Sequence, residues 1–401
     1  MKDFEKKVEA YALKNAITYN GKAQMGSVIS GLFNEGLKKS EISKYVKNIS
    51  TILKKVNSLT LKEQEKGFEK LRKFVHEREV REGLQELPNV KKSGVVMRFA
   101  PSASGPWHIG HAITVCLSAL YVKKYGGTLY IRIEDTNPEN IYKPAYKMIE
   151  DEAKWLLKGM GKVVIQSERM NLYYKYAKKL IKKNAAYVCE CSGDTFREHV
   201  KKKENCPCRK ASVKENLQRW GKMLDKKGYA EGKAVLRFKS NMKDKNPAMR
   251  DFPLARINET PHVLQKKKYR VWPLMNLAVT VDDIEMKMTH IIRGKDHRDN
   301  ALRQKMIFKV LGKKYPWAGF IGRIKFKDLD LSTTKMRQAI EKGKYQGWDD
   351  KRLPTIASLK KQKYKPGAFW KFAEQVGLSE SDKVIDREEY FKLLNSFNKI
   401  K

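Results

Sequence analysis

Hydrophobic residues recur at the spacing of an amphipathic helix in the N-terminal part of the chain. Two runs carry this pattern: Val8, Tyr11 and Ala12 in the first, and Ile42, Val46, Ile49, Leu53 and Val56 in the second. Ser40 stands just before the second run and has the side chain of a helix N-cap. The polar stretch ELPNVKKSG interrupts the pattern. The sequence therefore predicts an N-terminal helical domain over residues 1–92.

Beyond that stretch the pattern changes to alternating strands and helices. VVMRFA is a short strand, HIGHAITVCLSALYVKKYG a helix, and TLYIRIEDT a second strand. A strand, a helix and a strand in such close succession form a βαβ unit, which predicts a parallel sheet. A basic, strand-poor stretch follows, and a second α/β pattern begins near Tyr269 with LAVTVDD and MKMTHIIRGKDH. The C-terminal part is helical again.

The charge of the chain is strongly unbalanced. Its 401 residues include 85 Lys and Arg against 45 Asp and Glu, a formal net charge of +40. Such an excess favours a polyanionic partner, nucleic acid first and an anionic membrane second. The alternative is a lysine-rich surface that is merely solvated. The N-terminus lacks an apolar signal core, and no run approaches about 18 apolar residues. We therefore expect a cytoplasmic protein without a membrane span.

Four of the five cysteines form two close pairs. Cys189 and Cys191 lie in CEC, and Cys206 and Cys208 lie in CPC after a short polar loop. Thiolates are strong zinc ligands, and two tight turns can direct four sulfurs inward, so we expect a structural Zn²⁺ site. Free thiols or a disulfide are the alternatives. Cys116 stands alone in an apolar run and is expected to be a buried, unreactive thiol.

Two histidines, His108 and His111 in PSASGPWHIGH, lie three residues apart at the start of the expected helix. In a Rossmann-type fold this end of the helix faces phosphates, because its free N–H groups and positive dipole point at the ligand. The two histidines share one face, and Gly110 between them leaves room for a flat base. The pattern predicts a nucleoside triphosphate site, with metal ligation and a polar helix start as alternatives. No Gly-x-x-x-x-Gly-Lys loop is present, so a P-loop fold is not expected.

The stretch RFAPSASGPWHIGHA resembles the strand and HIGH signature of the class I aminoacyl-tRNA synthetases. Further segments resemble, in order, the archaeal type of glutamyl-tRNA synthetase: YGGTLYIRIEDTNPEN, AYVCECSGDTFREHV with CPCRK, NPAMRDFPLARI, VWPLMNLAVTVDD, THIIRGKDHRDN and GWDDKRLPTIASL. Because many linked segments match over nearly the whole chain, coincidence is a poor explanation.

This resemblance implies an α/β fold around a Rossmann-type, parallel-sheet, nucleotide-binding catalytic domain. An inserted α+β domain would bind the tRNA acceptor stem and carry the zinc knuckle. The expected boundaries are an N-terminal helical domain at 1–92, the two catalytic halves at 93–185 and 269–330, the inserted domain at 186–268, and a KMSKS-like loop with a helical stem-contact domain at 331–401.

The resemblance also implies a two-step ligase reaction. ATP with Mg²⁺ and L-glutamate would form glutamyl-adenylate and pyrophosphate, and the glutamyl group would pass to the terminal adenosine of tRNA(Glu), with tRNA(Gln) as an additional candidate. His108 and His111 would stabilise the ATP phosphates as catalytic residues, with Gly110 under the adenosine. 

Three further residues acquire a role from the same resemblance. Arg98 and Arg293 would hold the carboxylates of the substrate, and a dicarboxylic amino acid indeed calls for bidentate cationic groups. A phosphate contact is the alternative for Arg98. Asp135, in IEDT, would orient the reacting end or the terminal adenosine; a strand-end cap is the alternative.

The second signature of the family, KMSKS, is altered in this chain. The equivalent stretch reads DLSTTKMRQ, in which Ser332 matches the central serine but Thr333 occupies the usual lysine position. Lys335 is the nearest lysine and is expected to clamp the ATP phosphates, with Arg337 as the alternative. 

Enzymes of this family continue into two β-barrels that read the anticodon, and no such pattern of strands follows in this sequence. A second polypeptide carrying the barrels, their removal, and a short paralog that glutamylates a modified tRNA base are the explanations considered. A catalytically silent tRNA-binding protein is a hypothesis of another class. For RNA contacts we expect the lysines of VLQKKKYR and SLKKQKYKPG to meet backbone phosphates.

Overall fold

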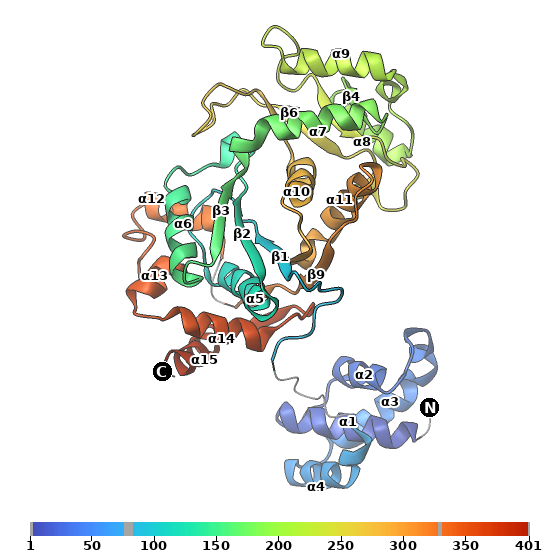
Figure 1. The fold of residues 1–401 in the computed structure, drawn as a ribbon. Coiled ribbons are helices and arrows are strands. Elements are labelled where there is room, and N and C mark those ends of the chain that lie inside the picture. The colour runs from blue at the N-terminus through green and yellow to red at the C-terminus, as the bar shows by residue number, and fades with distance from the viewer. Residues whose placement is uncertain (1–2, 76–82, 328–330, 400–401) are drawn as a thin grey trace. The chain divides into compact units, whose positions relative to one another are not determined.

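The computed structural model describes residues 3–75, 83–327 and 331–399, and the chain divides into two compact units, 1–81 and 82–401 (Figure 1). The predicted boundary at residue 92 lies inside the second unit, because Leu87 and Val90 pack into its core. In the described residues, no helix combines the length and the apolar character that a membrane crossing requires.

The first unit is a bundle of helices. Its elements are α1 (Phe4–Thr18), α2 (Met25–Asn34), α3 (Ile42–Asn57) and α4 (Leu61–Leu71). The apolar residues of the predicted runs are buried except at two positions: Val46 is exposed and Ile42 is half-buried. Ser40 does not cap α3. It lies inside a short 3₁₀ turn at Lys39–Glu41, and Glu41 is the residue before the helix.

The second unit is built on a parallel sheet. Three strands pair in the order β1 (Val95–Phe99), β2 (Gly127–Ile133) and β3 (Gly161–Ile165), and β8 (His290–Gly294) pairs with β9 (Trp317–Ile321). The N–H of Thr289 donates to the Val96 carbonyl at 3.0 Å, so β8 packs beside β1. The strands therefore lie in the order β3-β2-β1-β8-β9, and the chain changes direction across the sheet between β1 and β8, the place where open α/β sheets bind ligands.

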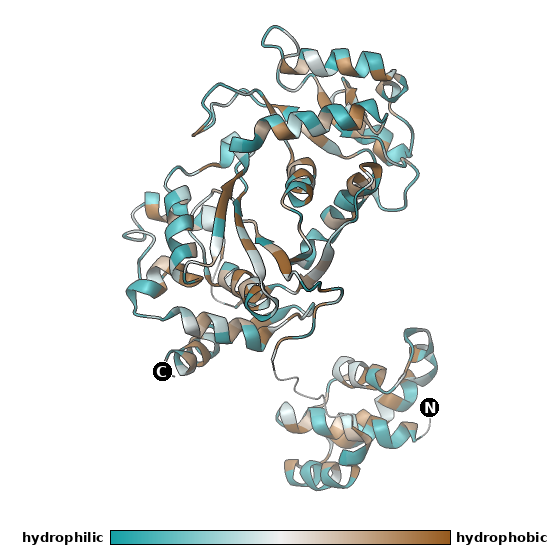
Figure 2. Cartoon of the chain, in the orientation of Figure 1, coloured by the Kyte–Doolittle hydropathy of each residue, from teal (hydrophilic) through white to brown (hydrophobic). Residues whose placement is uncertain are grey.

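Helices cover this sheet. They are α5 (Ile109–Tyr125), α6 (Ala145–Leu156), α10 (Met275–Glu285) and α11 (Arg298–Val310). Figure 2 shows hydrophobic residues concentrated along the central strands. The expected strand, helix and strand over 95–133 are all present, and β1 and β2 are parallel as predicted. Cys116 is buried on α5, as expected.

The inserted region contains a four-stranded antiparallel sheet, so the expectation of a strand-poor stretch was wrong. Its strands pair in the order β4 (Ala186–Cys189), β5 (Val235–Phe238), β6 (Pro253–Ile257) and β7 (Val271–Pro273), with α7 (Met170–Lys182), α8 (Gly193–Lys202) and α9 (Val213–Leu224) around them. One hydrophobic core includes residues of this sheet together with Met170 on α7 and Ile307 on α11, so it extends beyond the expected limits of 186 and 268. These strands are only three to five residues long, too short for a clear period-two pattern.

The C-terminal segment shares the core of the catalytic sheet. Its elements are β10 (Ile324–Phe326), α12 (Thr333–Glu341), α13 (Ile356–Lys361), α14 (Pro366–Val376), β11 (Lys383–Ile385) and α15 (Arg387–Lys399). Helix α14 packs on α5, and Phe369, Phe372 and Tyr390 belong to the same core as β1. Strand β11 pairs in parallel with β10, which leads toward the KMSKS-like stretch.

Candidate active site

The HIGH turn places two histidine rings on top of each other at the start of α5. His108 is the N-cap residue, and its Nδ1 accepts the N–H of Gly110 at 3.1 Å. The Nδ1 of His111 accepts the N–H of His108 at 3.4 Å. The two rings are stacked with centroids 3.7 Å apart, so the prediction that they share one face is confirmed.

The hydrogen bonds and the burial of these rings decide their protonation. Because each Nδ1 accepts a backbone N–H, the ring proton is assigned to Nε2, which is then a donor. Burial lowers the pKa of His108 well below its ordinary value, helped by the neighbouring His111, and lowers the pKa of His111 to about 4. Both rings are therefore neutral near pH 7, and each offers one N–H at the positive end of a helix.

The KMSKS-like segment lies against the HIGH turn although more than two hundred residues separate them. A Cβ at Gly105 would approach Thr333 Cγ2 to 2.3 Å, and one at Gly110 would lie 3.3 Å from Leu331 Cδ1. Ser332 caps α12 by accepting the N–H of Lys335 at 3.4 Å. Lys335 is exposed in the first turn of this helix. The structure thus places Leu331 and Thr333, the neighbours of Ser332, against the segment that carries the histidines, and Lys335 follows in the first turn of α12. Positions 328–330 lie outside the described residues.

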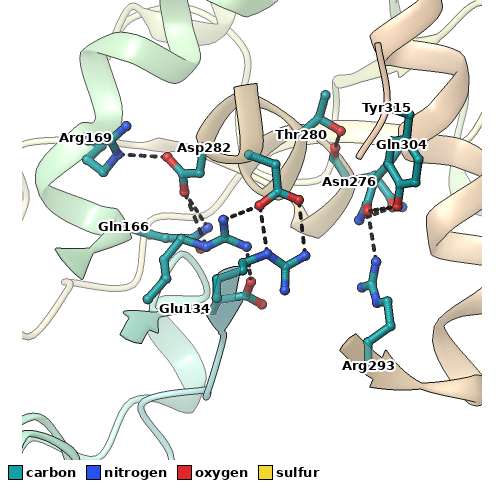
Figure 3. Close-up of polar contacts among 12 residues, drawn as sticks. Glu134, Gln166, Arg169, Asn276, Thr280, Asp282, Arg293, Gln304 and Tyr315 are labelled. Carbon is teal, nitrogen blue, oxygen red and sulfur yellow. Dashed lines mark hydrogen bonds and ion pairs between the residues drawn. The ribbon is translucent and has the colours of Figure 1, made fainter. Parts of the chain in front are cut away.

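A buried ion network joins β1, β2 and α10 (Figure 3). Asp283 accepts two hydrogen bonds from Arg98, from Nε at 2.7 Å and from Nη2 at 3.1 Å, and a third from Arg132 Nη1 at 2.6 Å. Burial alone would raise the pKa of Asp283, but the two guanidinium groups outweigh it and hold this pKa below its usual value. Arg98, expected to bind glutamate, is therefore already paired with a carboxylate and keeps only its remaining N–H groups for a ligand.

Asp282 extends the network toward the inserted region. Its carboxylate accepts Arg169 Nε at 2.7 Å, Gln166 Nε2 at 2.8 Å and the Tyr173 hydroxyl at 2.8 Å. Arg132 also bonds Glu134 at 3.1 Å. Sequence reasoning missed the importance of this network. The available signals were a pair of aspartates in the apolar helix NLAVTVDDIEM and an arginine inside the strand YIRIED.

Arg293, at the end of β8, differs from the other arginines of the network. It is only 8% exposed, and its Nη1 donates to the amide oxygen of Gln304 at 2.9 Å, close to the hydroxyl of Tyr315 (Figure 3). In the described part of the chain it makes no ion pair, and its Nε has no hydrogen-bond partner. Burial lowers the pKa of Arg293, and repulsion from Arg98 lowers it further. A nearly buried cation with neutral partners provides a strong site for an anion.

These features can be set beside known proteins. The family model for the catalytic domain of class I tRNA synthetases specific for E and Q matches residues 94–399. The chain belongs to this synthetase family. It is 42% identical to the glutamate–tRNA ligase of Methanocaldococcus jannaschii, over 97% of this chain and 70% of that protein. It is 40% identical to the glutamate–tRNA ligase of Methanobrevibacter smithii, over 99% of this chain and 71% of that protein.

Solved structures support the fold of the synthetase. A glutamate tRNA ligase from Elizabethkingia meningosepticum in complex with its amino acid has a TM-score of 0.54 at 19% identity, over 76% of this chain and 69% of that chain. The glutamate-tRNA synthetase of Elizabethkingia anophelis has a TM-score of 0.50 at 19% identity, over 75% of this chain and 70% of that chain. The Rossmann-like catalytic fold and the family membership expected from the sequence are thereby confirmed.

Asp135 of the synthetase is buried, and it makes hydrogen bonds that connect the catalytic sheet to the inserted region. Its carboxylate accepts the Tyr146 hydroxyl at 2.7 Å and both the N–H and the hydroxyl of Ser167, at 2.8 and 2.7 Å. The His262 Nε2 donates to the Asp135 backbone carbonyl at 2.9 Å. The geometry favours the structural alternative for Asp135, and a direct contact with the acceptor end stays a prediction.

The four cysteines converge in the inserted region of the synthetase. Their sulfurs all lie within 4.8 Å of one another, and Cys206 Sγ is 3.5 Å from Cys189 Sγ and 3.3 Å from Cys191 Sγ. Tetrahedral zinc with bonds of about 2.3 Å places its sulfur ligands roughly 3.8 Å apart. The sulfur separations in the cluster are close to this value, and all four cysteines are free of disulfides. The cluster therefore fits a zinc ion.

Arg209 anchors this knuckle to the antiparallel sheet. It follows Cys208 directly, and its Nη1 lies 2.6 Å from both carboxylate oxygens of Asp251. The same Asp251 accepts the hydroxyl of Tyr187, which precedes Cys189 on β4, at 2.9 Å. The cysteine turns are thus held from both ends, which favours a structural role for a bound metal.

Proposed function

We propose that the chain is a glutamate–tRNA ligase that activates L-glutamate with ATP and transfers it to the terminal adenosine of tRNA(Glu). The observation that carries this proposal is Arg293, a nearly buried guanidinium without a carboxylate partner in the described residues. Arg98, Arg132 and Arg169 each already pair with an aspartate. A carboxylate of the substrate would therefore compensate the charge of Arg293, which the neutral amide of glutamine could not do.

The HIGH turn supplies the groups needed for the first step. In that step a glutamate carboxylate oxygen attacks the α-phosphorus of ATP, and the bond to the pyrophosphate leaving group breaks. The Nε2–H groups of His108 and His111 would donate to the phosphate oxygens on which charge develops, and they require no proton uptake because both rings are neutral. Mg²⁺ bound with ATP would neutralise the β- and γ-phosphates.

Lys335 would contribute the cation that the altered KMSKS-like segment retains. It lies in the first turn of α12, whose cap Ser332 and neighbour Thr333 lie beside the HIGH turn. A lysine there can reach the leaving phosphates as a mobile point charge. Ser332 would help to orient the same phosphates from the helix N-terminus.

The RNA partner would be bound by exposed lysines on two separate elements. Lys266, Lys267 and Lys268 are exposed at the turn before β7, and Lys360, Lys361 and Lys363 are exposed around the end of α13. Lysine contacts of this kind neutralise backbone phosphates and are largely independent of sequence. We place the enzyme in the cytoplasm, where tRNA is charged for translation, and we propose Zn²⁺ as a structural ion in the cysteine knuckle.

Pyrophosphate exchange tests the activation step. The 401-residue chain is incubated with ATP, Mg²⁺, labelled pyrophosphate and total tRNA, with glutamate or glutamine as substrate. Exchange should require glutamate, and Arg293→Gln should abolish most of it, whereas Lys309→Gln, an exposed cation on α11, should not. Exchange that glutamine supports equally well, or that survives Arg293→Gln, would contradict the proposal.

Charging with labelled glutamate then identifies the RNA product. Label on the 3′ end of tRNA(Glu) supports the proposed ligase, and label on tRNA(Gln) as well extends its specificity. Label on an internal base would instead assign the chain to the paralog. Tight RNA binding without exchange would favour the silent tRNA-binding protein, and charging that appears only after a second polypeptide is added would show that an anticodon-binding partner is required.

A further inference from the structure

Glu152 is a buried carboxylate that no step of the proposed reaction uses. It lies on α6 and is 7% exposed. Its Oε2 accepts the backbone N–H of Trp107 at 2.6 Å, while its Oε1 is buried and has no hydrogen-bond partner in the described residues. Burying an ionisable group with one oxygen unpaired costs folding free energy, so the hydrogen bond that it makes is a candidate for a specific role.

Trp107 is the residue immediately before the HIGH turn. Its backbone is held on both sides, because Glu152 accepts its N–H and its carbonyl accepts the N–H of Ile356 at 2.9 Å. Its indole is fully buried and meets Phe99 edge-on, with ring centroids 5.2 Å apart. The chain that enters α5 at His108 is therefore clamped between α6 and the segment that begins α13.

We propose that Glu152 is a positioning residue for ATP binding, which holds Trp107 so that the two histidines of the HIGH turn face the phosphates. The inference rests on the proposed function for the identity of the ligand. Glu152 itself does not reach the reacting atoms through any contact in the structure. It acts by fixing the backbone from which His108 projects, and displacements of about 0.5 Å are enough to weaken paired donors of this kind.

The protonation state of Glu152 supports a measurable signature. Burial raises the pKa of Glu152 to about 8, and the hydrogen bond from the backbone N–H of Trp107 opposes this rise. The charged groups that face it are Lys360 on α13, which lowers this pKa, and Asp151 on its own helix, which raises it. An ionised carboxylate accepts a hydrogen bond more strongly than a neutral carboxyl group, so the hold on Trp107 tightens as the pH rises through about 8.

Direct binding of ATP with Mg²⁺ to the full chain, measured by calorimetry from about pH 6.5 to about pH 9, tests the inference. Glu152→Ala removes the acceptor and should weaken ATP binding about tenfold at high pH. Glu152→Gln keeps a carbonyl acceptor without a titrating proton. It should restore most of the affinity and lose the change in ATP affinity near pH 8. Glu150→Gln, an exposed carboxylate on the same helix, is the matched control and should behave as the unmodified chain.

A second readout separates positioning from a general structural role. In pyrophosphate exchange, Glu152→Ala should raise the KM for ATP and leave the KM for glutamate within about twofold. Unchanged ATP affinity in a folded Glu152→Ala variant would overturn the inference, as would equal losses for ATP and glutamate together with a lower melting temperature. If the unmodified chain binds ATP but shows no glutamate-dependent exchange, the proposed function fails, and the binding data still decide the role of Glu152.

Discussion

Replacing Asp283 with asparagine tests whether the buried ion network holds the catalytic unit together. The carboxylate is fully buried and accepts three hydrogen bonds from the guanidinium groups of Arg98 and Arg132. Removing one partner from a buried charged group typically costs about 3–5 kcal/mol. Because asparagine keeps one carbonyl acceptor, we expect the lower end of this range, about 3 kcal/mol. The variant should also lose affinity for glutamate, since Arg98 is no longer fixed.

Tryptophan fluorescence during urea unfolding is a suitable assay for this variant. All seven tryptophans lie between Trp107 and Trp370, so their signal reports on the second unit and not on the N-terminal bundle. Asp194→Asn is the matched control, because Asp194 is 91% exposed in its ion pair with Arg197. Removing an exposed pair of this kind should change the free energy of unfolding by less than about 1 kcal/mol.

The pH dependence gives the same prediction a definite sign. The pKa of Asp283 is held below its ordinary value in the folded chain, so its contribution to stability is present above the pKa of the unfolded chain. The difference between the unmodified chain and Asp283→Asn should stay constant near neutral pH and shrink only as the pH falls below about 4. A loss of stability no larger than that of Asp194→Asn would refute the reasoning.

Three further predictions concern the other parts of the site. Cys208→Ser should reduce the zinc content, measured by mass spectrometry, from one ion per chain to none, and it should lower the melting temperature of the second unit, whereas Cys116→Ser should keep the zinc. Lys335→Ala should slow pyrophosphate exchange at least about tenfold, while Lys342→Ala at the far end of α12 should not; equal rates for the two would contradict the assignment. Neutralising the lysines around the end of α13, which are Lys360, Lys361 and Lys363, should lower the slope of log affinity for tRNA against log salt by about 2. A reduction of about 3 is not expected, because Lys361 already pairs with Asp349. An unchanged slope would exclude this surface from tRNA binding.

Local sequence was sufficient wherever function is encoded in a few adjacent residues. The HIGH turn could be predicted because a histidine pair at helical spacing needs only one strand end and one helix start to become a phosphate site. The four cysteines could be predicted as a cluster because two short turns bring them together. The βαβ unit followed from apolar periodicity over a continuous stretch.

Elements that depend on distant partners could not be predicted in the same way. The strands of the inserted sheet are short, and their pairing joins residues as far apart as Ala186 and Phe238, so no local period in the sequence predicts them. In the sequence, Asp282 and Asp283 are two acidic residues in an apolar helix, and their ion-pair partners cannot be predicted. In the structure, these partners include an arginine on β2 and one at the start of α7. Glu152 became informative only once Trp107 lay against it.

By itself, the sequence determined the family, the Rossmann-type catalytic fold, and the residue types available for phosphate, carboxylate and metal. Only the tertiary structure decided how those residues are used. In the structure, Arg98 pairs with Asp283, and Arg293 contacts the neutral side chain of Gln304. Asp135 accepts a hydrogen bond from Ser167, where the catalytic sheet meets the inserted region. The physical reason is that a charge acquires its role from what surrounds it after burial, and those surroundings come from parts of the chain that no local pattern connects.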